Sequence, residues 1–474
     1  MVSFHVRSLP SPQKLYFTGY DRVGIQALSQ AISYGAMRDS AERDPPPRCH
    51  PGTREKATED IIRWIEEPNP SSTVLWVSGR AGVGKSALMQ KIAELGLVCF
   101  GGCFFFRRGT AGCNVKDHLF ATLAYQLAMN VSGMLEPVDQ AMMRDFSLPR
   151  MTAAVQLKRL IIEPIRLLPT SPRPTIIVII DGLDECEDFN SQHHILTLIG
   201  QVILDPDTAI RFIIASRPEY QISEMFNKEP LFSRTRRLIL DEGYDTAADI
   251  ERYFQDKFQE IYMLNRDIML DVNSPWPSKN DLKKLVWRSS GQFIYAATVI
   301  KFVGAHIDFR TPPERLEIVL DHGPTQASAF TELDRLYMHI LSLYPDSGVL
   351  VHTLGMILVL EAQNGEFFII HNPHSVIAAI TGLGEAKVHL VLRALQSLTE
   401  IHTAPLFDDA DDIEPNGTHV QWLKLSHRSF YDFLTDSLRS GPYFINRDLF
   451  ISRVLIRILE LAMISIKELK EGRR

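Results

Sequence analysis

Apolar residues in the first half of the chain gather in short continuous runs, separated by stretches with helical periodicity. The runs occupy 74–78, 97–106, 175–180, 211–215 and 237–240. A strand that is buried on both faces of a parallel sheet has this continuous pattern, because neither face meets water. Strands that alternate with helices therefore predict a doubly wound, mostly parallel α/β sheet of about five strands.

From about residue 245 the strand pattern gives way to helical periodicity. The helices expected directly after the sheet cover 246–261, 279–288 and 291–304. Between 331 and 440, short helices accompany a predicted hairpin in which 398–401 pairs with 420–425 across an acidic loop. Three helices and a hairpin favour a winged helix, and 448–470 predicts one long closing helix.

These patterns divide the chain into successive segments, as expected for 474 residues, which exceed one typical hydrophobic core. Three consecutive prolines, Pro45 to Pro47, exclude a helix and mark a linker or an extended strap. The predicted segments are an N-terminal extension and linker (1–48), an α/β domain (49–243), a helical domain (244–330), a winged-helix-like domain (331–440) and a C-terminal helix (441–474).

The first apolar run leads into Gly79-Arg80-Ala81-Gly82-Val83-Gly84-Lys85-Ser86, which has the GxxxxGKS pattern of a phosphate-binding loop. Glycines let backbone N–H groups curve around phosphates, and the helix that follows directs its positive end at them. Lys85 is expected to reach the β- and γ-phosphates, and Ser86 to offer its hydroxyl to Mg²⁺. The predicted nucleotide-binding residues here are Gly79, Gly82, Val83, Gly84, Lys85, Ser86 and Ala87. A chance glycine-rich turn is the alternative, but strand, loop and helix occur in the required order.

An acidic cluster, Asp181-Gly182-Leu183-Asp184-Glu185, follows the third apolar run. A magnesium nucleotide needs a carboxylate at the end of a strand beside the phosphate loop, and Asp181 meets that need. Asp184 and Glu185 are placed to polarise a water for attack on the γ-phosphate, and the sequence does not decide between them. A solvated acidic turn is the alternative interpretation. The position of the cluster inside the same α/β pattern favours a metal site.

Two further residues are candidates for contact with the nucleotide. Arg217 follows the run 211–215 at the sheet edge where ligands bind in such folds, so it can contact the γ-phosphate. A salt bridge between Arg217 and the acidic cluster is the alternative. His427 lies between a predicted strand and the helical stretch 429–434, where a histidine is more often a helix cap than a functional residue.

Composition narrows the class of protein. With 45% hydrophobic and 23% charged residues, the chain is an ordinary globular protein. A net charge of −7 does not indicate a nucleic-acid-binding protein, and the basic cluster at 234–237 is short enough to be a solvated turn. Five cysteines without zinc-like spacing fit free thiols in a reducing compartment. With no signal peptide and no membrane-length apolar run, we expect a cytoplasmic protein.

These motifs together resemble the NACHT-type STAND NTPases, specifically a fungal (mushroom-type) group with a nephrocystin-3-like N-terminal region, from about residue 40 to 440. The stretches that carry the resemblance are Cys49-His50-Pro51-Gly52-Thr53-Arg54, Gly79 to Ser86, Asp181 to Glu185, Ala215-Ser216-Arg217-Pro218-Glu219, Ser289 to Ala297, and His427-Arg428-Ser429-Phe430-Tyr431-Asp432-Phe433-Leu434. Where relatives usually have Gly-Leu-Phe-Ile-Tyr, this chain has Gly291-Gln292-Phe293-Ile294-Tyr295.

The resemblance implies a role for each matching residue. Lys85 and Ser86 would bind phosphate and Mg²⁺, with Asp181 as the Walker B carboxylate. Asp184 or Glu185 would support hydrolysis, and Arg217 would be the sensor arginine.

The resemblance also implies roles for two histidines. His427 matches the winged-helix histidine that contacts the β-phosphate of ADP in the closed form. His50, Thr53 and the neighbouring Arg54 match the N-terminal flank that touches the adenine.

The expected function is an ATP/ADP-dependent molecular switch of signalling or innate-defence type, with slow hydrolysis and with GTP as a possible nucleotide. ADP would hold the α/β domain against the winged helix through His427, and ATP would permit self-association or association with related NACHT proteins. A constitutive ATPase or GTPase is one alternative. Another is a truncated nucleotide-binding fragment that co-assembles with full-length relatives, because no repeat array follows residue 440 and no separate effector precedes residue 40.

Overall fold

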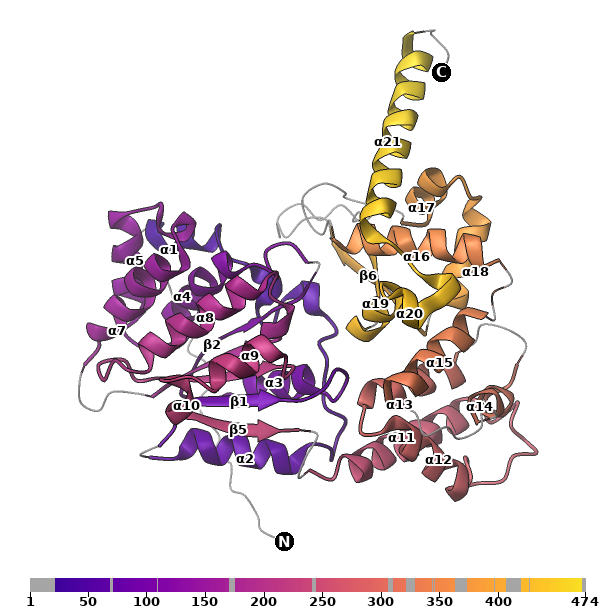
Figure 1. Ribbon diagram of the computed structural model, residues 1–474, viewed down its shortest axis with the longest axis horizontal. Helices are drawn as coiled ribbons and strands as arrows, with labels where there is room; N and C mark the ends of the chain where they lie inside the picture. The colour runs from indigo at the N-terminus through magenta and orange to yellow at the C-terminus, as the bar shows by residue number, and fades with distance from the viewer. Residues whose placement is uncertain are drawn as a thin grey trace.

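The structure is a computed structural model of the 474-residue chain. It describes residues 22–68, 71–108, 110–169, 175–240, 244–305, 310–320, 329–342, 344, 346–362, 373–395, 397–405, 419–425 and 427–470. An α/β body built from the first half of the chain lies beside a mainly helical body built from the second half, and the C-terminal part of the last helix projects away from both (Figure 1).

A five-stranded parallel sheet forms the centre of the α/β body, which confirms the predicted fold class. Its strands are β1 (Val74–Ser78), β2 (Phe100–Phe105), β3 (Ile176–Asp181), β4 (Ile210–Ser216) and β5 (Thr235–Ile239), in the order β2-β3-β4-β1-β5. Every neighbouring pair is parallel, with Asp181 opposite Ala215 and Ser78 opposite Ser216. The loops that follow β1, β3 and β4 therefore open on one edge of the sheet.

Helices cover both faces of this sheet because alternate residues of each strand enter different cores. Trp76 packs in the core beneath α4 (Leu119–Asn130) and α8 (Phe189–Val202), whereas Leu75 packs in the core beneath α2 (Glu55–Glu66) and α3 (Lys85–Glu94). The other helices of this body are α1 (Val23–Ser29), α5 (Leu135–Arg144), α6 (Ala153–Gln156), α7 (Glu163–Arg166), α9 (Tyr220–Phe226) and α10 (Leu231–Arg234), with a π-helical turn at Leu157–Ile162. Burial on both faces explains why the strands read as continuous apolar runs.

The second body begins with helices, as predicted, and continues into a winged-helix arrangement of three helices and a hairpin. Its first helices are α11 (Thr246–Leu264), α12 (Lys279–Ser289), α13 (Phe293–Val303), α14 (Pro312–Leu320) and α15 (Ala329–Ser342). The winged-helix elements are α16 (Ser347–Ala362), α17 (Pro373–Thr381), α18 (Glu385–Ala394), β6 (Thr399–Pro405) and β7 (His419–Leu425). The helices α19 (Arg428–Leu434), α20 (Ser437–Ser440) and α21 (Arg447–Lys470) complete the body.

One continuous hydrophobic core joins the helices and the winged helix. It runs from Ile250 on α11 to Val454 on α21 and crosses the predicted boundary at residue 330. The predicted acidic loop of the hairpin, 408–417, lies outside the described residues. Within the described ranges, no single helix is both long and apolar enough to cross a membrane.

Residues 22–47 lie against the α/β body and form the segment that we call the strap. α1 packs on α5, and Arg38 donates a hydrogen bond to the carbonyl of Ala93 at the end of α3. Arg43 is buried, donates to Gln90 at 3.1 Å and stacks over the ring of Phe105 at 3.7 Å. The proline-rich stretch that follows is therefore placed beside the carboxyl edge of the sheet.

Candidate functional site

A cavity of about 430 Å³ lies at the carboxyl edge of the sheet and receives residues from both bodies. Its lining residues from the α/β body are Arg43, Pro45, Pro47, Ala81, Gly82, Gly84, Lys85, Ser86, Ala87, Phe106, Arg107, Arg108, Asp181, Gly182, Asp184, Glu185 and Arg217. Those from the second body are Phe293, Ile294, Ala297, Leu358, Leu425, His427, Tyr431 and Arg447. The structure thus gathers most of the predicted site residues around one space.

Two glycines give the phosphate loop its shape. Gly82 and Gly84 have φ values of +77° and +93°, in the left-handed region that residues with a side chain rarely adopt. A Cβ atom on Gly82 would also overlap the side chain of Ile294, whose N–H donates to the Gly82 carbonyl at 3.2 Å. The start of α13 is therefore docked directly on the loop.

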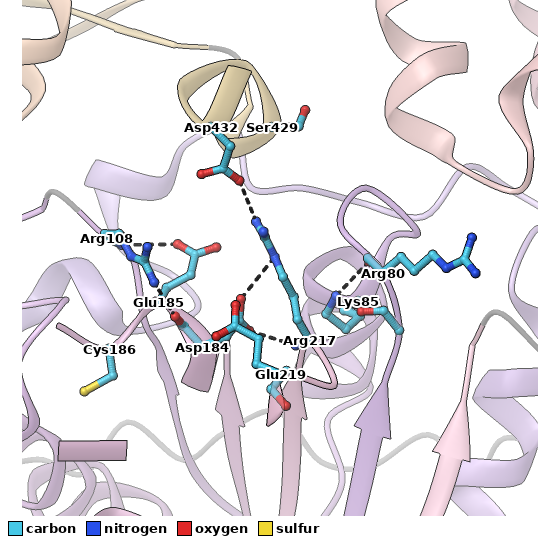
Figure 2. A network of polar contacts seen from close by, with 12 residues as sticks. Arg80, Lys85, Arg108, Asp184, Glu185, Cys186, Arg217, Glu219, Ser429 and Asp432 are labelled. Atoms are coloured by element: carbon cyan, nitrogen blue, oxygen red, sulfur yellow. Dashed lines mark hydrogen bonds and ion pairs between the residues drawn. The ribbon is translucent and has the colours of Figure 1, made fainter. Parts of the chain in front are cut away.

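Lys85 and Ser86 begin α3, so the positive end of this helix faces the cavity. The Lys85 ammonium donates to the carbonyls of Gly79 and Arg80 at 2.7 and 2.9 Å. Figure 2 shows the bond to Arg80. Gly79 and Val83 contribute to the loop through such carbonyls and do not line the cavity, whereas Ala87 does. A bound polyphosphate would compete with the loop carbonyls for the Lys85 ammonium.

Asp181 ends β3 and is only 3% exposed. Burial raises the pKa of its carboxyl to about 6, and a hydrogen bond from the Ser86 side chain opposes that rise. Among the described residues, Oδ1 of Asp181 has no hydrogen-bond partner. An unpaired carboxylate oxygen beside a serine hydroxyl suits Mg²⁺, which prefers oxygen ligands and takes the rest from phosphate and water. Ser86 and Asp181 therefore fit the predicted metal.

Asp184 and Glu185 take different roles in the structure. Asp184 is buried, and its Oδ1 accepts the backbone N–H of Arg217 at 2.9 Å while its Oδ2 lies 3.2 Å from Arg217 Nε. Glu185 is only partly buried, and its Oε2 accepts the backbone N–H of Arg108 at 3.1 Å. Asp184 thus orients the arginine, whereas Glu185 presents a carboxylate to the cavity.

Arg217 connects the two bodies. Its Nη2 lies 3.1 Å from Oδ2 of Asp432 on α19, so one guanidinium pairs with a carboxylate from each body (Figure 2). The pKa of Arg217 is raised by Asp432 and Asp184, although burial opposes the shift. The salt bridge considered from the sequence is present, and the same guanidinium lines the cavity.

His427 has both of the features that the sequence left as alternatives. It is the N-cap of α19, where its Nδ1 accepts the backbone N–H of Ser429 at 3.0 Å, and it lines the cavity. Burial, followed by the charge of Arg217, lowers the pKa of His427 to about 4. The imidazole is therefore neutral at pH 7. Because Nδ1 is an acceptor, its proton is on Nε2, which can donate to a ligand.

His50 and Thr53 lie elsewhere. The Nε2 of His50 is 2.7 Å from Oδ2 of Asp256 on α11, and Thr53 is buried with its hydroxyl donating to the His50 carbonyl at 2.7 Å. Neither residue lines the cavity. Their neighbour Arg54 donates to the Val83 carbonyl at 2.6 Å, so this segment supports the phosphate loop from behind.

Sequence reasoning missed several residues of the cavity. Arg43 comes from the strap, Arg107 and Arg108 follow β2, and Arg447 begins α21. Arg43 could have been suspected from its place two residues before the prolines, but no motif marks Arg107, Arg108 or Arg447. Asp432 was quoted only as part of a motif, and its pairing with Arg217 spans 215 residues of sequence.

A glycine-rich loop between a parallel strand and a helix, with a carboxylate at the end of the neighbouring strand, defines a P-loop NTPase. More particularly, residues 52–217 match the family described as Nephrocystin 3, N-terminal. The match covers the phosphate loop, the acidic cluster and Arg217.

Two solved structures have a distant likeness to the chain. Cdc6p from Pyrobaculum aerophilum aligns with a TM-score of 0.33 at 11% identity, over 86% of this chain and 96% of that chain. The ORC2 protein of Aeropyrum pernix, solved as ADPNP–ADP complexes, aligns with a TM-score of 0.33 at 14% identity over the same shares. Among curated proteins, no sequence matches the chain. Scores at this level assign no role to this protein.

Proposed function

We propose that this protein is a nucleotide-operated switch that binds ATP or ADP with Mg²⁺ in the cavity, with GTP as an alternative nucleotide, and hydrolyses the triphosphate slowly. The observation that carries the proposal is Arg217, which reaches from Asp184 at the sheet edge to Asp432 on α19. The cap of the same helix, His427, lines the same cavity. A ligand bound there would contact both bodies at once.

The switch rests on competition for one guanidinium. A γ-phosphate near Arg217 would compete with Asp432, whereas a diphosphate would leave the Arg217–Asp432 pair in place. A ligand shifts a conformational equilibrium only by its differential affinity for the two states, and this competition supplies such a difference. ADP therefore favours the joined bodies, and ATP favours their release.

The same chemistry assigns roles within the site. Ser86 and Asp181 would hold Mg²⁺, which polarises the phosphates when it is bound. Glu185 would orient the attacking water, since Asp184 already uses both carboxylate oxygens on Arg217. The Nε2–H of neutral His427 would donate to a phosphate oxygen. We also propose a cytoplasmic location, which the five free cysteines support.

The first test identifies the nucleotide. Denaturing the purified protein and analysing the released small molecules by mass spectrometry is expected to give ADP. Lys85→Ala removes the ammonium that the phosphates need, so we expect at least about a hundredfold loss of affinity for a fluorescent adenine nucleotide. Lys91→Ala is the matched control, because Lys91 is also on α3 but pairs with Glu55 at 3.2 Å outside the cavity.

Turnover separates the switch from a constitutive enzyme. A switch predicts slow hydrolysis with retained product. Rapid steady-state hydrolysis of ATP or GTP by the purified protein would contradict the switch and favour the constitutive NTPase. Equal binding by the wild type and Lys85→Ala would contradict nucleotide binding at the loop.

A further inference from the structure

Arg447 is the first residue of α21 and lines the cavity alongside the phosphate loop. Its Nε is buried and has no hydrogen-bond partner in the part of the chain that the structure describes. A buried guanidinium N–H without an acceptor is costly, because the group has lost its water and gained nothing in return. Arg447 is therefore placed as a donor for an anion inside the cavity.

A second arginine supports the same interpretation independently. Arg43, on the strap, is 5% exposed, lines the same cavity, and its Nε also lacks a partner within the described residues. Burial and the neighbouring Arg107 lower the pKa of Arg43 to about 10. Two arginines from distant parts of the chain, each with an Nε–H that lacks a partner among the described residues, thus border one space.

The charge of the lining points to a polyphosphate. Six lining residues carry cationic groups, Arg43, Lys85, Arg107, Arg108, Arg217 and Arg447, against three carboxyl groups, Asp181, Asp184 and Glu185. Arg217 and Asp184 neutralise each other, which leaves five cationic groups against two carboxyl groups, so the positive excess persists. An anion with several charged oxygens would balance this excess positive charge, and arginine is suited to bind phosphate through two N–H groups.

We propose that Arg447 is a phosphate ligand that couples nucleotide binding to the position of α21. This inference rests on the nucleotide binding proposed above. Behind Arg447, Phe450 is buried in the second core against Gly355 of α16, so the base of the helix is fixed to the winged helix. Val454, one turn further along, lies in the same core, and the C-terminal part of α21 projects away from both bodies (Figure 1). A phosphate held by Arg447 orders the start of this projecting helix.

The test compares full-length protein carrying Arg447→Ala, Arg447→Lys or Arg453→Ala with the wild type. A fluorescent ADP derivative is expected to bind Arg447→Ala about tenfold more weakly, and Arg447→Lys with an intermediate affinity. Saturating ADP is expected to slow hydrogen exchange in the first turn of α21 in the wild type, and not in Arg447→Ala. Arg453 is exposed on the same helix and lines no part of the cavity, so Arg453→Ala should match the wild type.

Each outcome decides the inference. Unchanged ADP affinity together with unchanged protection of α21 in Arg447→Ala would overturn it, even if Lys85→Ala abolishes binding. Failure of the wild type to bind nucleotide would instead overturn the proposed function. If Arg447→Ala unfolds at a lower temperature than the wild type without nucleotide, Arg447→Gln replaces it, because glutamine keeps a polar side chain at the helix start. An unchanged ADP affinity of Arg447→Gln would also overturn the inference.

Discussion

At the residue scale, Asp181 shows how a site can weaken the fold that contains it. Burial raises the pKa of this carboxyl from 3.8 to about 6, so the folded state disfavours the carboxylate relative to the unfolded chain. The resulting loss of stability is absent below pH 3.8 and complete above about pH 6. Asp181→Asn removes the charge and keeps an acceptor for Ser86. We expect it to raise the free energy of unfolding at pH 7.5 by about 2–3 kcal/mol, as measured by urea denaturation.

Two further measurements serve as controls for Asp181→Asn: nucleotide affinity and the pH dependence of stability. Asp181→Asn should lose the Mg²⁺-dependent part of nucleotide affinity, and wild-type affinity should decline as the pH falls below about 6, where Asp181 becomes protonated. At pH 4 the wild type and the variant should have nearly equal stability. A lower free energy of unfolding for Asp181→Asn at pH 7.5 would show that the carboxylate is not the unfavourable group.

At the scale of the element, α19 depends on His427 as its cap. His427→Ala removes both the cap and the predicted phosphate donor, whereas His427→Asn keeps a side-chain oxygen for the Ser429 N–H. We expect His427→Ala to lower the free energy of unfolding by about 1 kcal/mol and His427→Asn to lower it much less. Both variants should release ADP faster than the wild type, as measured by displacement of a fluorescent nucleotide.

The pair of variants separates the two roles of this residue. Slow ADP release from His427→Asn, equal to that of the wild type, would reduce His427 to a helix cap.

The lowered pKa of His427 also sets how stability depends on pH. Because the folded state disfavours the imidazolium, the free energy of unfolding decreases as the pH falls from 6.5 toward about 4.

At the scale of the whole molecule, the contact between Arg217 and Asp432 crosses from one body to the other. Asp432→Asn removes the charge that holds Arg217, and both side chains are about a quarter exposed, so we expect a modest effect of about 1 kcal/mol, or roughly fivefold in the equilibrium between joined and released bodies. Small-angle X-ray scattering with ADP should show a larger radius of gyration for Asp432→Asn than for the wild type.

Glu460→Gln is the control for this change, because Glu460 pairs with Arg457 at 2.9 Å within α21 and crosses no boundary between the bodies. It should leave the scattering profile unchanged. An Asp432→Asn protein as compact as the wild type under both ADP and ATP would mean that the Arg217–Asp432 pair does not hold the bodies together.

The features that could be predicted from the sequence are those that depend on residues close together in the chain. The sheet was predictable because burial on both faces leaves continuous apolar runs, and the phosphate loop because its glycines supply a backbone shape that other residues resist. The strands nevertheless begin and end differently from the apolar runs: β2 starts at Phe100 and not at 97, and β5 spans Thr235–Ile239 and not 237–240. Strand ends are set by pairing with neighbours, which hydropathy does not record.

The sequence by itself determined the local chemistry of this protein: a loop shaped for phosphate, a serine and an aspartate that are predicted to bind a metal, and an arginine at the sheet edge. Only the tertiary structure decided that Arg217 pairs with Asp432, that His427 caps a helix and also faces the cavity, and that Arg43 and Arg447 border it. It also placed His50 and Thr53 outside the cavity. These contacts join segments far apart in the chain, and no periodicity within a short window encodes how two separately packed bodies meet.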